Sequence, residues 1–126
     1  MKLCITSIGK EKDALADQRF GRCPYFVIFD TEENTYKAVE NNGVVSPQGA
    51  GIAAAQQIID EKVDAVITGH MGPNAMQLIN GAAIKIYQGK GVTIEEEIQL
   101  FHEGALMAID QPVPAHSGMG NGQKRG

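Results

Sequence analysis

The second half of the sequence alternates between short apolar runs and helical patterns, and this alternation limits the folds that the chain can adopt. Segments 64–68 (DAVIT) and 83–87 (AIKIY) are short and rich in β-branched residues, which is typical of buried strands. Helical patterns cover residues 52–62 and 74–80, and a third begins after Thr93. Strands that are separated by helices pair in parallel through right-handed crossovers.

The first forty residues carry a different pattern. Segments 2–8, 24–30 and 36–40 are predicted strands, and only the turn 31–35 separates the last two, which indicates an antiparallel hairpin. The predicted order is β-β-β-α-β-α-β, followed by a helix that Thr93 and Glu96 begin with a capping box. We therefore expect an α/β fold with a five-stranded mixed sheet and helices on both faces.

Length and charge limit the class of protein. A chain of 126 residues fits one domain, which we place at residues 1–110, followed by a flexible, glycine-rich tail at 111–126. A net charge of −4 argues against a nucleic-acid binder, which needs a basic face. No apolar run approaches the roughly 20 residues that span a bilayer, and the first residues lack the pattern of a signal peptide. We expect a cytoplasmic protein without a membrane partner.

The predicted strand directions gather several loops at one edge of the sheet. The loops 9–22, 41–51, 69–73 and 88–92 all lie outside the carboxyl ends of the parallel strands, where ligands bind in open α/β sheets. Three helices begin there, and their N-terminal N–H groups favour an anion. Glycines in these loops let the backbone approach a ligand closely. The polar candidates at this edge are Arg19, Arg22, Cys23, Ser46, His70 and Lys90.

The cysteines and histidines divide into candidate ligands and structural residues. Cys23 starts the second strand, and its neighbours Arg19 and Arg22 would favour a thiolate. Cys23 and His70 are therefore the candidate metal ligands, although Cys23 can equally be a structural strand residue and His70 can hydrogen-bond its own loop. Cys4, in the first strand, is expected to be a small buried hydrophobe. We expect His102 at the surface and His116 in the tail.

Catalysis is not indicated by the sequence. A two-metal enzyme needs carboxylates that converge on its metals, but Asp30 and Asp64 fall at the opposite edge of the predicted sheet. Neither a phosphate-binding P-loop motif nor a nucleophile elbow is present. We therefore expect a binding protein and not an enzyme.

Two segments resemble those of a known family. Residues 17–26 (DQRFGRCPYF) resemble the D-x-x-F-G-x-x-x-x-F signature of the dinitrogenase iron–molybdenum cofactor-binding family, and residues 69–75 (GHMGPNA) resemble its second glycine loop. The resemblance covers roughly residues 1–110 and implies a ribonuclease H-like fold without nuclease carboxylates. It also implies a carrier of the iron–molybdenum cofactor or its precursor, with cofactor-biosynthesis proteins as partners. With the edge residues above, the candidate cofactor-binding residues are Arg19, Phe20, Gly21, Arg22, Gly69, Gly72 and Lys90.

One position departs from the family pattern. The nitrogenase-associated members tend to have histidine where this chain has Arg19. A guanidinium stays protonated and cannot ligate a metal, so Arg19 would pair with an anionic cluster. The leading prediction is a carrier of an anionic iron–sulfur or iron–molybdenum–sulfur cofactor. The alternatives are a small-anion or nucleotide-phosphate binding module without metal, and a protein-interaction domain that uses an exposed edge strand.

Overall fold

The computed structural model describes residues 1–45 and 49–109. Ser46 and the predicted tail 111–126, with His116, lie outside the described residues. The described chain forms an α/β fold with six strands, three α-helices and a short 3-10 helix, arranged in the following order along the sequence: β1 (Lys2–Ser7), β2 (Tyr25–Asp30), β3 (Thr35–Glu40), η1 (Asn42–Val45), α1 (Ala50–Asp60), β4 (Ala65–Thr68), α2 (Pro73–Gly81), β5 (Lys85–Gln88), α3 (Ile94–His102) and β6 (Met107–Ala108).

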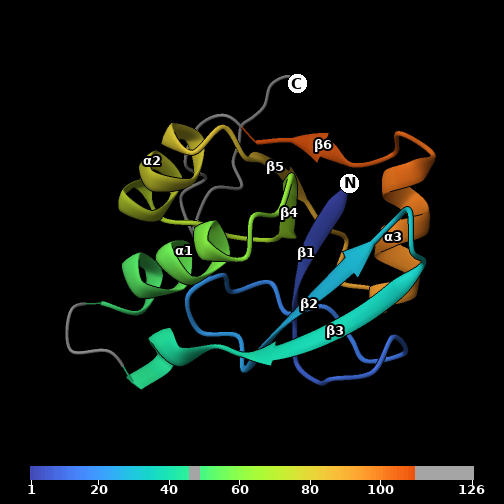
Figure 1. Cartoon of the computed structure of the whole chain (residues 1–126), viewed down its shortest axis with the longest axis horizontal. Helices are drawn as coiled ribbons and strands as arrows, with labels where there is room; N and C mark the ends of the chain where they lie inside the picture. Colours follow the sequence, from blue (N-terminus) through green and yellow to red (C-terminus); the bar gives the residue numbers. More distant parts are fainter. Residues whose placement is uncertain (46–48, 110–126) are drawn as a thin grey trace.

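The sheet is mixed, and its strand order is β3-β2-β1-β4-β5-β6. β1 lies in the middle, antiparallel to β2 and parallel to β4 (Figure 1). β3 continues the antiparallel hairpin, and β5 continues the parallel part, so these predicted directions are confirmed. The prediction of five strands is wrong, because the two-residue β6 adds an antiparallel sixth strand beside β5. The ribonuclease H-like assignment stays a prediction.

Each face of the sheet carries its own hydrophobic core, because successive side chains of a strand point to opposite faces. Cys4 belongs to the core beneath α1 and α2, whereas its neighbours Leu3 and Ile5 belong to the core beneath α3. Figure 1 shows α1 and α2 together on one side of the sheet and α3 on the other. The predicted helices on both faces and the predicted burial of Cys4 are both confirmed.

The helices follow the predicted patterns with some shifts. α3 begins with the predicted capping box, in which the Thr93 side chain accepts a hydrogen bond from the Glu96 N–H and the Glu96 side chain accepts one from the Thr93 N–H. α1 begins at Ala50, two residues earlier than predicted, and buries Ala54, Ala55 and Ile58. These residues belong to the core that α1 shares with α2 and the sheet.

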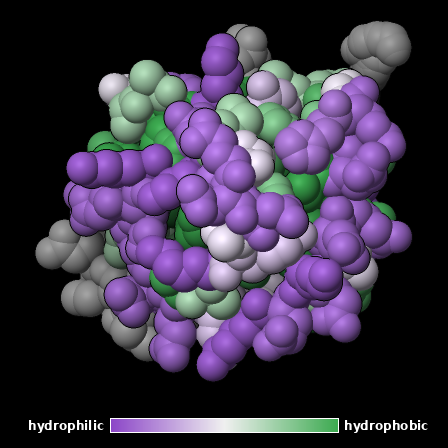
Figure 2. All heavy atoms as spheres, turned by 45° about the vertical axis from the view of Figure 1, so that its right-hand side comes forward, coloured by the Kyte–Doolittle hydropathy of each residue, from purple (hydrophilic) through white to green (hydrophobic). Residues whose placement is uncertain are grey.

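The surface on the α3 side of the molecule is mainly hydrophilic (Figure 2). Smaller apolar patches lie between the polar side chains in this view. The exposed residues Glu95 and Glu96 in the first turn of α3 contribute to this character. Within the described residues, none of the helices has the length and apolar character that a membrane crossing requires.

Candidate functional site

The loop between β1 and β2, residues 8–24, runs across the carboxyl edge of the sheet, which is the edge where β1, β4 and β5 end. Main-chain hydrogen bonds hold it there. The Asp17 N–H donates to the Thr6 carbonyl at the end of β1 (2.8 Å), and the His70 N–H, after β4, donates to the Gln18 carbonyl (2.7 Å). The Phe20 N–H donates back to the His70 carbonyl (3.1 Å). Figure 1 shows this loop, in blue, below the strands and beside the start of α1.

This pairing brings together two of the predicted site residues from distant parts of the chain. Arg19 and His70 are partners in a short parallel bridge. Both residues are exposed, so their side chains are available to a ligand. The predicted convergence of these two residues at the carboxyl edge is therefore confirmed.

Arg19 is held by a carboxylate that sequence reasoning did not place in the site. Asp17 Oδ1 accepts hydrogen bonds from Arg19 Nε and from the Arg19 backbone N–H (both 2.9 Å), and Asp17 Oδ2 accepts one from Arg19 Nη2 (2.8 Å). The Asp17 side chain is only 4% exposed, whereas that of Arg19 is 61% exposed. The hydrogen bonds from the guanidinium lower the pKa of Asp17, so its carboxylate remains ionised at neutral pH.

Two helix N-termini, close along the chain to His70 and to the loop that carries Arg19, open into one cavity. The cavity has a volume of about 290 Å³. The first intrahelical hydrogen bonds run from Ala53 to the Gly49 carbonyl in α1 and from Met76 to the Gly72 carbonyl in α2. The cavity is lined by residues at the starts of these two helices: Gly49, Gly51, Ile52, Gly72, Pro73, Asn74 and Ala75.

The N-cap residues of these two helices are Gly49 and Gly72, which have no side chain to cap the helix. In contrast, α3 is fully capped by Thr93. Backbone N–H groups in the first turn of a helix need partners from outside the helix. Together with the helix dipole, these N–H groups make the cavity suited to an anion.

Two glycines let the loop 8–24 approach this cavity. A Cβ on Gly21 would lie 2.9 Å from the backbone nitrogen of Gly51, at the start of α1. A Cβ on Gly69 would lie 2.7 Å from the Gln18 carbonyl oxygen. Real Cβ atoms do not make such short contacts with backbone, so these positions require glycine for the observed packing. Phe20, next to Gly21 in the chain, is buried and packs on Phe26 with ring centroids 6.0 Å apart, so it anchors the loop.

The prediction of a thiolate at Cys23 is wrong. Its side chain is fully buried, and Sγ donates a hydrogen bond to the Phe20 carbonyl (3.3 Å). Burial, followed by the nearby negative charge of Asp17, raises the pKa of Cys23 to about 12. The neighbouring arginines do not reverse this effect: Arg22 is exposed, and Arg19 is paired with Asp17. Cys23 is therefore a protonated core residue beneath the loop.

Asn41, which sequence reasoning missed, closes over Cys23. Its Nδ2 donates hydrogen bonds to the carbonyls of Cys23 (2.8 Å) and Gly21 (3.2 Å), and its Oδ1 accepts one from the Gly43 N–H (2.8 Å). The side chain thereby joins the end of the site loop to the segment that follows β3. An asparagine just after a strand is a turn signal in the sequence, but its partners twenty residues away carry no local signal.

Lys90 lies in the loop after β5 and is exposed. The shape of this loop depends on Glu97, a second residue that sequence reasoning missed. Glu97 is fully buried, and its carboxylate accepts hydrogen bonds from the N–H groups of Lys90 (2.9 and 3.0 Å) and Gly91 (2.9 Å). The position of Glu97 between Ile94 and Ile98, on the buried stripe of α3, is the signal that could have identified it.

Within residues 1–45 and 49–109, no group of three or more His, Cys, Asp or Glu side chains is arranged to hold a metal ion. The donors at the site are instead N–H groups, one guanidinium and one exposed imidazole. This set fits an anionic cluster that is bound through hydrogen bonds and charge, with His70 as the one exposed imidazole that could ligate a metal. It does not fit a bare cation.

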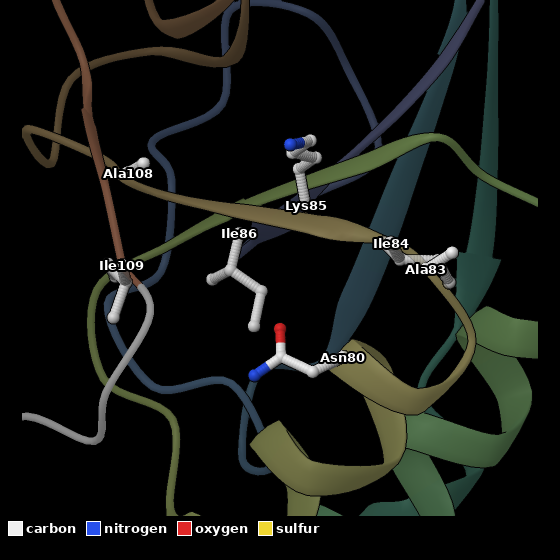
Figure 3. A pocket seen from close by; sticks show the side chains of 7 residues that line it. All are labelled: Asn80, Ala83, Ile84, Lys85, Ile86, Ala108 and Ile109. Atoms are coloured by element: carbon white, nitrogen blue, oxygen red, sulfur yellow. The ribbon is translucent and has the colours of Figure 1, made fainter.

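A second cavity, of about 440 Å³, lies near the opposite end of β5 (Figure 3). Its lining includes Ile84, Ile86 and Ile109. Figure 3 shows the Asn80 side chain directed toward Ile86, whereas Lys85 extends from the other side of the strand. This cavity is mainly apolar and is lined by none of the predicted site residues, so it is not part of the candidate site.

Comparisons with known proteins point to one family. Residues 1–104 match the family model for the dinitrogenase iron-molybdenum cofactor family. The apo form of the orange protein from Desulfovibrio gigas is similar in structure, with a TM-score of 0.85 and 32% identity over 90% of this chain and 96% of that protein. A Thermotoga protein provisionally assigned as a NifB protein has a TM-score of 0.80 and 31% identity over 90% and 97% of the two chains. An uncharacterised protein of Methanocaldococcus jannaschii is 33% identical over 90 residues, which are 69% of this chain and 76% of the relative.

Proposed function

This chain belongs to the dinitrogenase iron–molybdenum cofactor family, and from that membership we propose that it binds an anionic metal–sulfur cofactor, either an iron–sulfur or an iron–molybdenum–sulfur cluster. In this proposal the protein carries the cluster and does not transform it, and its partners are the proteins that supply and receive the cluster. The cluster is the cargo of the protein.

One observation carries the proposal: the glycine-capped N-termini of α1 and α2 open into the same cavity, and the exposed residues Arg19 and His70 lie on paired segments that adjoin the two helix starts. His70 is two residues before the N-cap Gly72, and Gly21, two residues after Arg19, packs on Gly51. N–H groups at helix starts stabilise negative charge, and a guanidinium donates charge-assisted hydrogen bonds to oxygen or sulfur acceptors. His70 could add one nitrogen ligand to an iron or molybdenum atom at the rim of the cluster.

Tetrathiomolybdate, a molybdenum–sulfur dianion, is a suitable probe for this proposal. We expect the protein to retain it under anaerobic conditions in a stoichiometric complex, which is measured from the absorption spectrum and the bound molybdenum. Arg19→Ala removes a charged hydrogen-bond donor and should weaken binding about tenfold or more. His70→Ala should change the spectrum of the bound anion if the imidazole ligates the metal.

Lys85→Ala is the matched control, because it removes one exposed positive charge at the opposite edge of the sheet. It should leave binding nearly unchanged, since exposed charges far from a site are screened by salt. Wild-type protein that retains no molybdenum would contradict the proposal. Equal losses in Arg19→Ala and Lys85→Ala would show that the binding is non-specific.

The same observation also favours a second candidate function, the binding of a small oxoanion or nucleotide phosphate without metal. Helix N-termini accept any anion of suitable size, and the described residues provide no set of three metal ligands. Phosphate and nucleotides would then raise the thermal unfolding midpoint. A shift with phosphate, combined with no retention of tetrathiomolybdate, would favour this function over the cofactor carrier.

A further inference from the structure

We infer that Asp17 is a positioning residue that fixes the direction in which Arg19 presents its guanidinium to the bound anion. This inference rests on the proposed function, because it assigns a role in anion binding to a residue that itself carries a negative charge. Two observations support it: the hydrogen-bond geometry between Asp17 and Arg19, and the hydrogen bonds that join Asp17 to the sheet.

Asp17 occupies one complete edge of the Arg19 guanidinium. Arg19 Nε and Nη2 donate to the two different oxygens of the carboxylate, at 2.9 and 2.8 Å. A guanidinium has five N–H donors in a fixed plane, so the bonds to Asp17 leave the terminal fork of Nη1 and Nη2 for another partner. Because the Arg19 side chain is largely exposed although Asp17 is buried, the remaining donors are accessible to a ligand.

The backbone of Asp17 is itself fixed by the centre of the sheet. The Asp17 N–H donates to the Thr6 carbonyl (2.8 Å), and the Thr6 hydroxyl lies 2.6 Å from the Asp17 carbonyl oxygen and 2.9 Å from Thr68 Oγ1. Thr6 and Thr68 are both buried, on the neighbouring strands β1 and β4. The direction of the Arg19 side chain is therefore set by the two central strands through Asp17.

The pair also has little net charge. At the position of a bound anion, the negative charge of Asp17 offsets much of the attraction to the positive charge of Arg19. The contribution of Arg19 to binding is therefore mainly directional hydrogen bonding by a side chain that is already ordered, which reduces the entropy lost on binding. A fork of two parallel N–H groups suits a ligand with two acceptor atoms on one side, such as two sulfur or oxygen atoms bonded to the same metal.

This geometry makes Asp17→Asn a decisive substitution. If only charge mattered, removal of a negative charge beside the site would strengthen the binding of an anion. If Asp17 positions Arg19, the substitution should weaken binding, because an asparagine amide nitrogen cannot accept the hydrogen bond from Nη2. The two interpretations therefore predict opposite signs for the same measurement.

The test is a double-mutant cycle with tetrathiomolybdate as the probe. We measure dissociation constants for the wild type, Asp17→Asn, Arg19→Ala and the double variant. With Arg19 present, Asp17→Asn should weaken binding about three- to tenfold. A loss of this size corresponds to the entropy cost of ordering one long side chain. In the Arg19→Ala background the same substitution should have no effect or strengthen binding. Asp13→Asn, an exposed position in the same loop, is the charge-matched control and should not weaken binding.

Arg19→Lys provides a second variant that does not alter a buried position. Lysine keeps the positive charge, but its ammonium group lacks the planar fork with which arginine bonds both Asp17 oxygens and a ligand. The substitution should therefore also weaken binding. Unchanged or tighter binding by Asp17→Asn in the wild-type background would overturn the inference. Binding by Arg19→Lys that is as tight as that of the wild type would also overturn the inference.

The signal of the Arg19 Nη2 proton that bonds Asp17 Oδ2 in NMR spectra separates this inference from the proposed function. In the wild type it should be sharp and protected from exchange with water, and in Asp17→Asn it should be lost. An unchanged signal would overturn the positioning role of Asp17. Wild-type protein that shows the protected signal but does not bind tetrathiomolybdate would overturn the proposed function instead.

Discussion

Residues that are adjacent in the sequence have opposite environments at this site. Arg19 and Arg22 are exposed, whereas Phe20 and Cys23 are buried. The sequence indicates that basic residues surround Cys23, but it does not show that Asn41 closes over the thiol or that Asp17 lies near it. Both facts depend on chain segments that meet only in the folded protein, which explains why the thiolate prediction failed.

The buried thiols lead to a testable prediction about reactivity. Since burial raises the pKa of Cys23 to about 12 and that of Cys4 well above its ordinary value, the native protein should react with a thiol reagent far more slowly than the unfolded protein does near neutral pH. The measurement is the rate of colour release from an aromatic disulfide reagent, with and without denaturant. Rapid reaction of a thiol in the native protein would contradict the buried position of Cys23.

The same shift predicts how stability depends on pH. The pKa of Cys23 rises from 9.0 to about 12 on folding, so the folded state holds this proton more tightly. Its contribution is fully present below the unfolded pKa and is lost as the pH rises from about 9 toward 12. Urea unfolding at increasing pH should therefore show that the wild type loses stability relative to Cys23→Ala. Parallel curves for the two proteins would contradict this result.

At the scale of the elements, local patterns predicted most of the fold. The strands β1 to β5 and the three helices were predicted from alternation, apolar stripes and the capping box at Thr93, because these signals are local. β6 was missed because a two-residue strand has no periodicity. It depends on pairing with β5 and on the bond from the Ile109 N–H to the Ile86 carbonyl (2.8 Å). The location of the candidate site was predicted, because the strand directions place the loops at one edge of the sheet. The roles of Asp17, Asn41 and Glu97 were not predicted.

Two glycines of the site provide a matched test of how closely the elements approach one another. Gly21→Ala would force a Cβ against the backbone of Gly51, and we expect a loss of about 1–3 kcal/mol in the free energy of unfolding. A Cβ on Gly72 has no heavy atom within 4 Å, and the φ of −70° suits alanine, so Gly72→Ala should cost less than about 0.5 kcal/mol. Denaturant unfolding measures both, and equal losses would contradict the close contact between Gly21 and Gly51.

At the scale of the whole molecule, the sheet separates two cores, and its centre is the best protected part. Among the described residues, β1 is paired on both sides and almost wholly buried, whereas β3 is paired only with β2 and is mostly exposed. The central strands also carry Thr6 and Thr68, which support the site from below. The rigid part of the molecule thus lies directly beneath the candidate site.

Native-state hydrogen exchange can test this arrangement. Amides of β1 and β4 should exchange only through global unfolding, with opening free energies of about 5–15 kcal/mol. Amides of β3 and β6 should open at a lower free energy, because fewer buried contacts hold the edges. Equal protection of β3 and β1 would contradict the view of β3 as a loosely held edge strand.

The attachment of the loop 8–24 has a consequence for how such a protein can diversify. Its path is fixed largely by backbone hydrogen bonds, from Asp17 to Thr6 and between Gln18, His70 and Phe20. Bonds of this kind do not depend on which side chain a position carries. Exposed positions such as 19, 22 and 70 can therefore exchange residues during evolution without moving the loop. One scaffold could in this way be retuned for anions of different size and composition by a few substitutions, while the rest of the chain stays under constant selection for folding.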